Sequence, residues 1–342
     1  MSRETIAWLN ENVLVGYGHK PWHFNEAVQS TMDKSNLYAG PIPKEDVASR
    51  LFDWQAEAQP LHVEVAGEFR RVPGRVGVAH GETGEVFGLF RSSYKIHQYR
   101  DWLLDNVACI LDDSDLGIAS AGLLVGGGVA FVTVKPAEEV VARCGMGIDS
   151  KILAATSHNG SLASTYKMVA TLVVCDNTLQ AALADFSPVS KTRHTKHSTL
   201  LVDNVRDALG LLGATSHAVV NWVDGLADTP ITDAQWESIL DSVWPDRPKD
   251  STRVRARLAN RRATVDELYR NDPRCNPWRG SALGAFQALN THRLHVAGPG
   301  GQGFERFERN TMGLLFNKAL TADADDLRVI LDVARGRVTP PV

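Results

Sequence analysis

The chain has 342 residues, a formal net charge of −4 and an ordinary composition, with 44% hydrophobic and 22% charged residues. Such a chain can bury a sizeable core, and no run of about 18 apolar residues predicts a membrane span. The first residues, MSRETIAWLNENV, lack the apolar stretch of a signal peptide, so we expect a cytoplasmic protein. The net charge excludes a general attraction to nucleic acids or membranes, and any polyanion must bind local basic patches.

The first segment, residues 1–60, is predicted to contain helices and loops. Apolar residues recur at helical spacing over residues 3–15 and 43–54, and Pro43 suits the first turn of a helix. Residues 16–24, GYGHKPWHF, have the composition of a loop.

The second segment, residues 61–198, is predicted to be a β-rich core, because its apolar residues recur with a period of two. The pattern occupies residues 61–90, 118–134 and 151–175. The first range predicts a β-meander, and the second predicts a hairpin that turns at Gly126-Gly127-Gly128. The third predicts a hairpin at Asn159-Gly160, since this pair readily takes the positive φ angles of a tight turn. Between the first two, residues 94–111 have the spacing of an amphipathic helix.

The third segment, residues 199–342, is predicted to be helical. The expected helices cover residues 199–225, 232–243, 251–270, 280–296, 304–319 and 323–335. Thr232 and Gln235 have the spacing of a capping box at the start of the second helix. The fold class is therefore α+β, with an antiparallel sheet of three hairpins interleaved with helices and followed by a helical C-terminal region.

The sequence shows no complete catalytic or metal-binding motif. Gly126-Gly127-Gly128 lacks the Lys-Ser/Thr of a phosphate loop, and it lies between two predicted strands. His158, Cys175, His194 and His197 are able to bind metals, but their spacing does not bring them together. The four cysteines include no C-x-x-C pair, so we expect reduced thiols and no zinc site, disulfide or cofactor. Asn177 suits a helix cap better than a ligand contact.

A basic tract from Lys191 to His197, KTRHTKH, is the strongest functional signal. Lys191, Arg193 and Lys196 place three permanent charges in six residues. A solvated linker and a phosphate-binding surface both remain open interpretations. As a functional hypothesis, we predict a surface for single-stranded DNA, made of Lys191, Arg193 and Lys196 with Lys95, Lys151 and Lys167 from the β-rich core.

Residues 253–262, RVRARLANRR, are a second basic stretch. On a helix its arginines share a face only in part. The stretch is therefore equally consistent with a solvated helix surface, with ion pairs to the acidic C-terminal helix, or with a second polyanion patch.

An ordered series of motifs resembles one known family. The series comprises HKPWH, VPGRVGVAHGETGEVFGLFRSSYKIHQ, SAGLLVGGGVAFVTV, ATSHNGS, VVCDNTLQAAL, KTRHTKHS, LADTPITDAQWESILDSVWP, GSALGAFQALNTHRLHVAG and FERNTMGLLFNKAL. Together these resemble the phage- and plasmid-like proteins called DUF932, related to the UPF0380 proteins of prophages, over about residues 19–320. Leu283 replaces a frequent aromatic residue, and Asn159-Gly160 replaces an Asp-Gly turn. The resemblance implies a mobile-element origin and a bacterial cytoplasm, and it transfers no catalytic residue.

Two functions of different classes are consistent with these observations. The first is a homo-oligomeric protein that binds single-stranded DNA. By analogy of fold, it would be a recombination accessory like the single-strand annealing proteins of the Rad52/Redβ kind. The second is an interaction protein that counters host defence, for instance by inhibiting restriction. An enzyme is the least supported, because no complete set of nucleophile, base and orienting group is visible.

Overall fold

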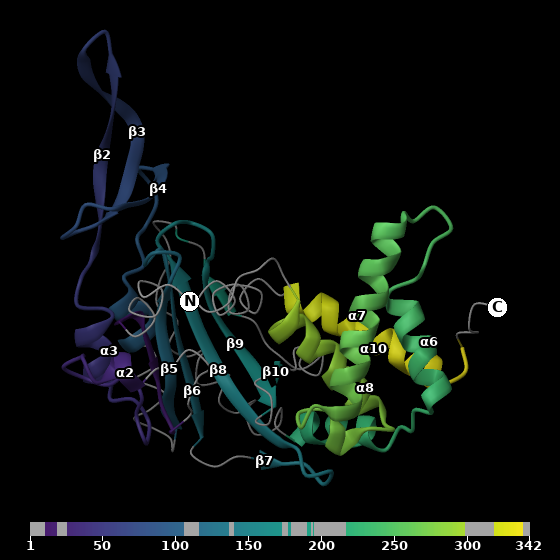
Figure 1. Cartoon of the computed structure of the whole chain (residues 1–342). Coiled ribbons are helices and arrows are strands. Elements are labelled where there is room, and N and C mark those ends of the chain that lie inside the picture. Colours follow the sequence, from purple (N-terminus) through teal and green to yellow (C-terminus); the bar gives the residue numbers. More distant parts are fainter. Residues whose placement is uncertain are drawn as a thin grey trace.

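A computed structural model describes residues 11–18, 26–105, 116–136, 140–172, 177–178, 190–192, 194, 217–297 and 318–337. Figure 1 shows a β-rich lobe beside a helical lobe, and a long β-ribbon that projects away from the first lobe. Antiparallel strands dominate the first half and helices the second, which confirms the α+β class.

The β-rich lobe is built on one antiparallel sheet. It contains β1 (Val13–Val15), β5 (Leu116–Leu124), β6 (Val129–Pro136), β7 (Val140–Val141), β8 (Gly147–Ser157), β9 (Ser164–Leu172), β10 (Asn177–Thr178) and β11 (Ser190–Thr192). The main order is β1-β5-β6-β8-β9-β10, with β11 also paired to β9 and β7 to β8. Two predicted hairpins are therefore confirmed, β5–β6 and β8–β9. The glycine turn is confirmed as well, with positive φ at Val125, Gly126 and Gly127.

One face of this sheet is covered by short helices. These are α2 (Glu26–Gln29), α3 (Lys44–Arg50) and the π-helix η1 (Arg100–Asp105). Val132 and Ile152 of the sheet belong to one buried cluster with Leu51 and Leu104 from the helical segments. Burial of such side chains is the main stabilising contribution to this lobe.

The predicted meander is separate from the large sheet, so the expectation of a single sheet was wrong. β2 (Ala56–Val65), β3 (Glu68–His80) and β4 (Val86–Arg91) form their own three-stranded antiparallel sheet. Residues 62–71 are exposed on both faces, so this end of the ribbon has no apolar face to pack against a core. We call residues 56–91 the arm. The boundary expected between residues 60 and 61 falls inside β2.

Two predicted helices differ from the structure. In the range 3–15, residues 11–12 are helical, but Val13–Val15 forms β1 and pairs with β5, because sheet pairing buries Val13 and Leu14. In the range 94–111, helical structure begins only near residue 99, and Arg100–Asp105 forms η1. Before it, the chain is extended enough for Tyr94 and His97 to pack against other rings.

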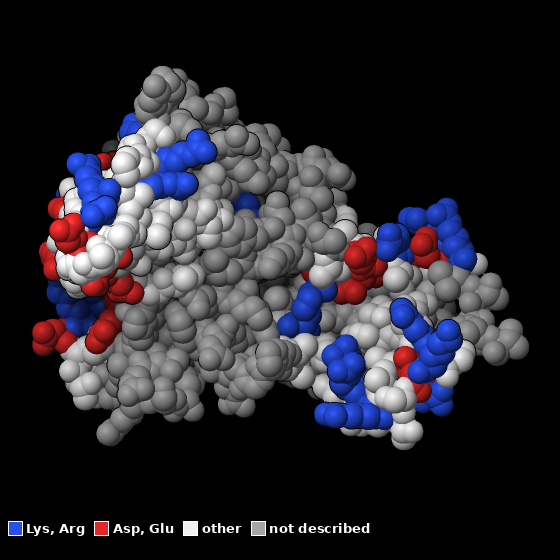
Figure 2. Space-filling model, turned by 90° about the horizontal axis from the view of Figure 1, so that it is seen from above, with Lys and Arg blue, Asp and Glu red and all other residues white. Residues whose placement is uncertain are grey.

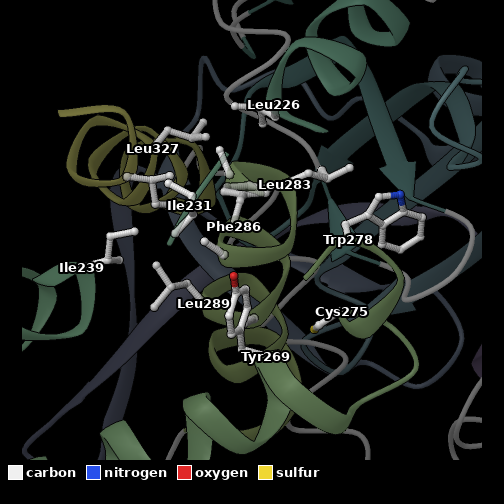
Figure 3. Packing of buried hydrophobic residues seen from close by; sticks show 14 of the residues in the cluster. Leu226, Ile231, Ile239, Tyr269, Cys275, Trp278, Leu283, Phe286, Leu289 and Leu327 are labelled. Carbon is white, nitrogen blue, oxygen red and sulfur yellow. The ribbon is translucent and has the colours of Figure 1, made fainter. Parts of the chain in front are cut away.

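The helical lobe contains residues 217–297 and 318–337. Its elements are the helical residues 217–227, α6 (Asp233–Val243), α7 (Thr252–Asn271), η3 (Asn276–Trp278), α8 (Ala282–Thr291), η4 (His292–Val296) and α10 (Lys318–Ala334). Figure 3 shows Leu283, Phe286 and Leu289 of α8 at the centre of its core. The predicted capping box is present at Thr232 and Gln235. None of the helices in these described ranges is long and apolar enough to cross a membrane.

The two lobes share a packed junction. Ala142, Met146 and Ile148, at the β7–β8 end of the large sheet, belong to the core of the helical lobe. The Trp278 indole donates a hydrogen bond to the Cys144 carbonyl at 3.1 Å, and the Asp224 carboxylate accepts one from the Cys144 amide at 2.9 Å. Cys144 and Cys275 are free thiols, while Cys109 and Cys175 lie outside the described residues.

Candidate nucleic-acid interface

The predicted lysines of the large sheet come together on one face. Lys167 of β9 lies opposite Leu153 of β8, and Lys151 lies two residues before Leu153, so both lysines share that face. Lys167 is only 5% exposed. The Lys151 ammonium lies 3.1 Å from one carboxylate oxygen of Asp149, and the buried Lys135 lies 2.7 Å from the other. In this arrangement Lys167 is not accessible to a phosphate, and the charge of Lys151 is already paired.

Of the remaining predicted residues, the structure describes two, Lys191 and Lys95. Lys191 lies in β11, where its backbone pairs with Thr165 of β9. Lys95 is exposed, and its carbonyl oxygen lies 3.2 Å from the His194 ring. Arg193 and Lys196 lie outside the described residues. The structure thus places Lys151, Lys167 and Lys191 on three neighbouring strands, and the phosphate surface itself stays a prediction.

A column of stacked rings fixes the middle of the basic tract. Phe90 stacks on Tyr94 at 4.0 Å between ring centroids, and Tyr94 stacks on His194 at 5.0 Å. His194 continues onto His97 at 4.0 Å, and His97 onto Trp102 at 3.6 Å. The column therefore connects the arm, through Phe90, to η1 and to residue 194.

Hydrogen bonds hold the histidines of this column in place. His97 Nδ1 and Ser164 Oγ are 2.7 Å apart, and so are Ser164 Oγ and Thr156 Oγ1. Thr156 Oγ1 lies 3.3 Å from His194 Nε2, which completes the chain. His97 is fully buried and Ser164 is 1% exposed, so this His–Ser pair is closed to a substrate and has a structural role.

Burial keeps His97, His158 and His194 neutral at pH 7. It lowers the pKa of His97 and of His158 to about 3, and that of His194 to about 4. Neighbouring histidines lower the pKa of His97 and His158 further. His194 therefore adds no charge to the basic tract at neutral pH. Among the described residues, no three His, Cys, Asp or Glu side chains form a group that would hold a metal ion.

The arm carries chemistry that the sequence analysis did not single out. At its tip, Ala66 and Gly67 have φ angles of 53° and 83°, which suit a tight two-residue turn between β2 and β3. Phe69, just after this turn, is 76% exposed. Arg71 lies two residues further along β3 and hence on the same face as Phe69.

Two arginines face each other across the base of the arm. Arg75 of β3 and Arg91 of β4 are direct partners in the antiparallel register, and both are exposed. Among the described residues, neither forms an ion pair with a carboxylate. By contrast, Arg70 pairs with Glu68 at 3.2 Å. The sequence FRRVPGR contains this signal, but only the register shows that Arg75 meets Arg91.

The second basic stretch, residues 253–262, lies in the exposed N-terminal part of α7. Arg253 and Arg257 of α7 are exposed and Arg261 is partly exposed, whereas Val265 and Tyr269 near the other end are buried. Figure 2 shows Lys and Arg side chains predominating over the helical lobe, while basic and acidic side chains are mixed over the arm. Ion pairs do account for Arg255 and Arg262, but their partners Asp246 and Asp241 lie just after α6 and within it, and not in the acidic C-terminal helix that was expected.

Comparison with known proteins identifies one family. A model described as a domain of unknown function (DUF932) matches residues 86–321, which is more than half of the 342 residues. The match includes β4, the ring column and α7, but not β2 and β3. Curated proteins and solved structures yield no match. The chain thus belongs to the DUF932 family, as its ordered motifs indicated.

Proposed function

We propose that this protein binds single-stranded nucleic acid along the arm. The observation that carries the proposal is the Arg75–Arg91 pair. Like charges directly opposite each other on neighbouring strands destabilise a sheet. A phosphate between the two guanidinium groups would remove this repulsion and accept hydrogen bonds from both, in the geometry that arginine suits best.

The exposed ring at the tip of the arm favours binding of single strands over binding of duplexes. Phe69 presents an exposed ring to solvent, with Arg71 on the same face. Bases of a single strand are free to stack on an aromatic ring, whereas paired bases are already stacked inside a helix. A strand that follows the arm would place phosphates at the arginines and a base at Phe69.

The basic tract offers a second contact for the same strand. Lys191 lies in the large sheet, and the ring column joins residue 194 to the arm through Phe90. Within this proposal, a recombination or single-strand annealing accessory on a mobile element is the finer role, and it requires a homo-oligomer to provide a longer groove.

Fluorescence anisotropy of labelled single strands and duplexes at several salt concentrations tests the proposal. In R75Q/R91Q we expect weaker single-strand binding. The salt slope, which is the steepness with which the logarithm of the binding constant falls against the logarithm of the salt concentration, should be lower by about 1.4 units, since each phosphate contact on a single strand contributes about 0.7. F69A should weaken binding while leaving the salt slope unchanged. Mass photometry of the same samples measures the oligomer.

The matched control is R328Q/R337Q, which removes two exposed arginines that are paired with Asp325 and Asp332 in the helical lobe. The triple variant K191A/R193A/K196A reports on the basic tract separately. If R75Q/R91Q binds single strands with the affinity and salt slope of the wild type, the arm is not the binding surface. If the wild-type protein binds no single strand at low salt, the function itself is rejected.

A further inference from the structure

The exposed half of α7 has an arrangement of charge that the fold does not explain. Arg253, Arg257 and Arg261 follow one another at intervals of four residues, so neighbouring arginines are about 6 Å apart along the helix axis and close to one face. Like charges at this spacing destabilise a helix. Among the described residues, none of the three forms an ion pair with a carboxylate.

The paired arginines of the same helix provide a contrast. Arg255 lies 3.3 Å from Asp246, Arg262 lies 2.6 Å from Asp241, and Arg270 lies 2.7 Å from Asp266. These arginines stabilise the lobe through carboxylates, Arg255 and Arg262 with partners outside α7 and Arg270 with a partner in the same helix. Within the described part of the chain, the stripe of Arg253, Arg257 and Arg261 has no such carboxylate partner, and Arg261 instead lies 5.7 Å from the Trp244 ring centre.

The chemistry of the surrounding surface limits what the stripe is able to bind. Thr252, Ala256, Ala259 and Asn260 lie beside the arginines and are exposed. They supply no large apolar group, whereas protein interfaces need a buried apolar centre and membrane-surface helices need an apolar face. They also supply no aromatic ring on which an unpaired base would stack. A row of phosphates is the partner that fits.

We propose that this stripe binds the phosphate backbone of duplex nucleic acid, without reading its sequence. The arginines lie along one line, and phosphates of a duplex strand likewise form a regular row of negative charge. The site is distinct from the arm, because it lies in the helical lobe and the Trp244 ring beside it lies under the Arg261 guanidinium. Figure 1 shows the arm and the N-terminal end of α7 projecting toward the same side of the molecule. A nucleic acid with a single-stranded part beside a duplex part would reach both.

The test is duplex binding by R253Q/R257Q, measured by anisotropy over a range of salt concentrations. We expect weaker binding to every duplex sequence and a salt slope lower by about 1.8 units, since each phosphate contact on a duplex contributes about 0.9. R255Q is the control on the same helix, because Asp246 already pairs with its charge. R328Q/R337Q is the control for the loss of two positive charges. Both controls should retain more of the slope.

A second measurement checks that R253Q/R257Q is folded. Arg257 is four residues from both Arg253 and Arg261, so removing two of these three like charges should leave the circular dichroism and the thermal midpoint of R253Q/R257Q equal to or above those of the wild type. Wild-type duplex affinity in this folded variant would overturn the proposal, as would a wild-type protein that binds no duplex. A wild-type protein that binds duplex through α7 but binds no single strand would reject the proposed function of the arm and leave this site standing.

Discussion

At the scale of single residues, the ring column depends on glycines that admit Phe90. A Cβ atom at Gly160 would lie 2.6 Å from Cε1 of Phe90, and one at Gly88 would lie 2.9 Å from Cε2. Gly160 also has a φ angle of 75°, which side chains disfavour. Gly160 thus serves both the turn after β8 and the packing of the arm against the body.

We expect Gly160→Ala to lower the free energy of unfolding by roughly 2–4 kcal/mol, from backbone strain together with displacement of Phe90. Gly145→Ala is the matched control, because Gly145 has a φ angle of 82° and no atom within 4 Å of a Cβ. Urea unfolding of the two variants separates the contributions. Equal losses in both variants would show that the Phe90 contact contributes nothing.

The sequence predicted the turn but not the contact at this position. Asn159-Gly160 indicates positive φ from its own chemistry, and the structure has it. Phe90 approaches from a different sheet, and no local pattern contains that information. His194 is a similar case. Its neighbours Lys191, Arg193 and Lys196 suggested a charged tract, whereas burial between Tyr94 and His97 makes the ring itself neutral.

At the scale of elements, local signals predicted the helices well where capping chemistry was present. The Thr232 hydroxyl accepts a hydrogen bond from the Gln235 amide at 3.2 Å, and the Gln235 side chain accepts one from the Thr232 amide at 2.9 Å. Both satisfy amide groups that a helix start leaves without partners. The start of α6 was therefore readable from two residues.

Thr232→Ala should lower the free energy of unfolding by about 1 kcal/mol, because the capping hydroxyl is lost. Thr264→Ala makes the same chemical change within α7, where the hydroxyl donates to the Asn260 carbonyl, and should change stability by only a few tenths of a kcal/mol. Thermal unfolding of both variants is the measurement. A loss in T264A as large as that in T232A would contradict the capping argument.

In the arm, the sequence predicted the strands but not the sheet to which they belong. Its period-two pattern predicted strands correctly, but the pattern did not say which sheet they join. Ala56 and Val78 at its base are buried, while Val63 and Val65 near its tip are exposed. Alternation looks the same in both places. The arginine contacts were beyond reach for the same reason, since Arg75 meets Arg91 only through the β3–β4 register.

At the scale of the whole molecule, the neutral histidines couple stability to pH. His97, His158 and His194 lie where the arm meets the large sheet, and His292 lies in the helical lobe with its pKa lowered to about 4 by burial and by nearby arginines. Ala142, Met146 and Ile148 connect the two lobes through one core. We therefore expect both lobes to unfold in one transition.

The free energy of unfolding should fall as the pH drops below about 6.5, where the unfolded histidines begin to bind protons. The folded histidines, with pKa values of about 3 to 4, stay neutral, so the unfolded chain binds more protons. Each such histidine contributes up to about 1.4 kcal/mol per pH unit, and this loss stops growing once the pH falls through the folded pKa. Asp224 and Asp272 have pKa values lowered from 3.8, so their contributions are lost only at more acidic pH.

Urea unfolding at a series of pH values from 7.5 to 4.5, roughly the window set by these pKa values, measures the slope. In His158→Phe the ring that stacks on Tyr99 is retained while its titrating nitrogens are removed, so the slope should be shallower by about 1.4 kcal/mol per pH unit. The variant also loses the contact between His158 and the His97 carbonyl, which lowers stability at every pH without changing the slope. His62→Phe, at an exposed site on the arm, is the control for exchanging a histidine for a phenylalanine. A wild-type free energy of unfolding that is constant between pH 6.5 and 4.5 would contradict this prediction. It would mean that these histidines bind protons in the folded chain as readily as in the unfolded chain, so the ring column would not be tightly buried.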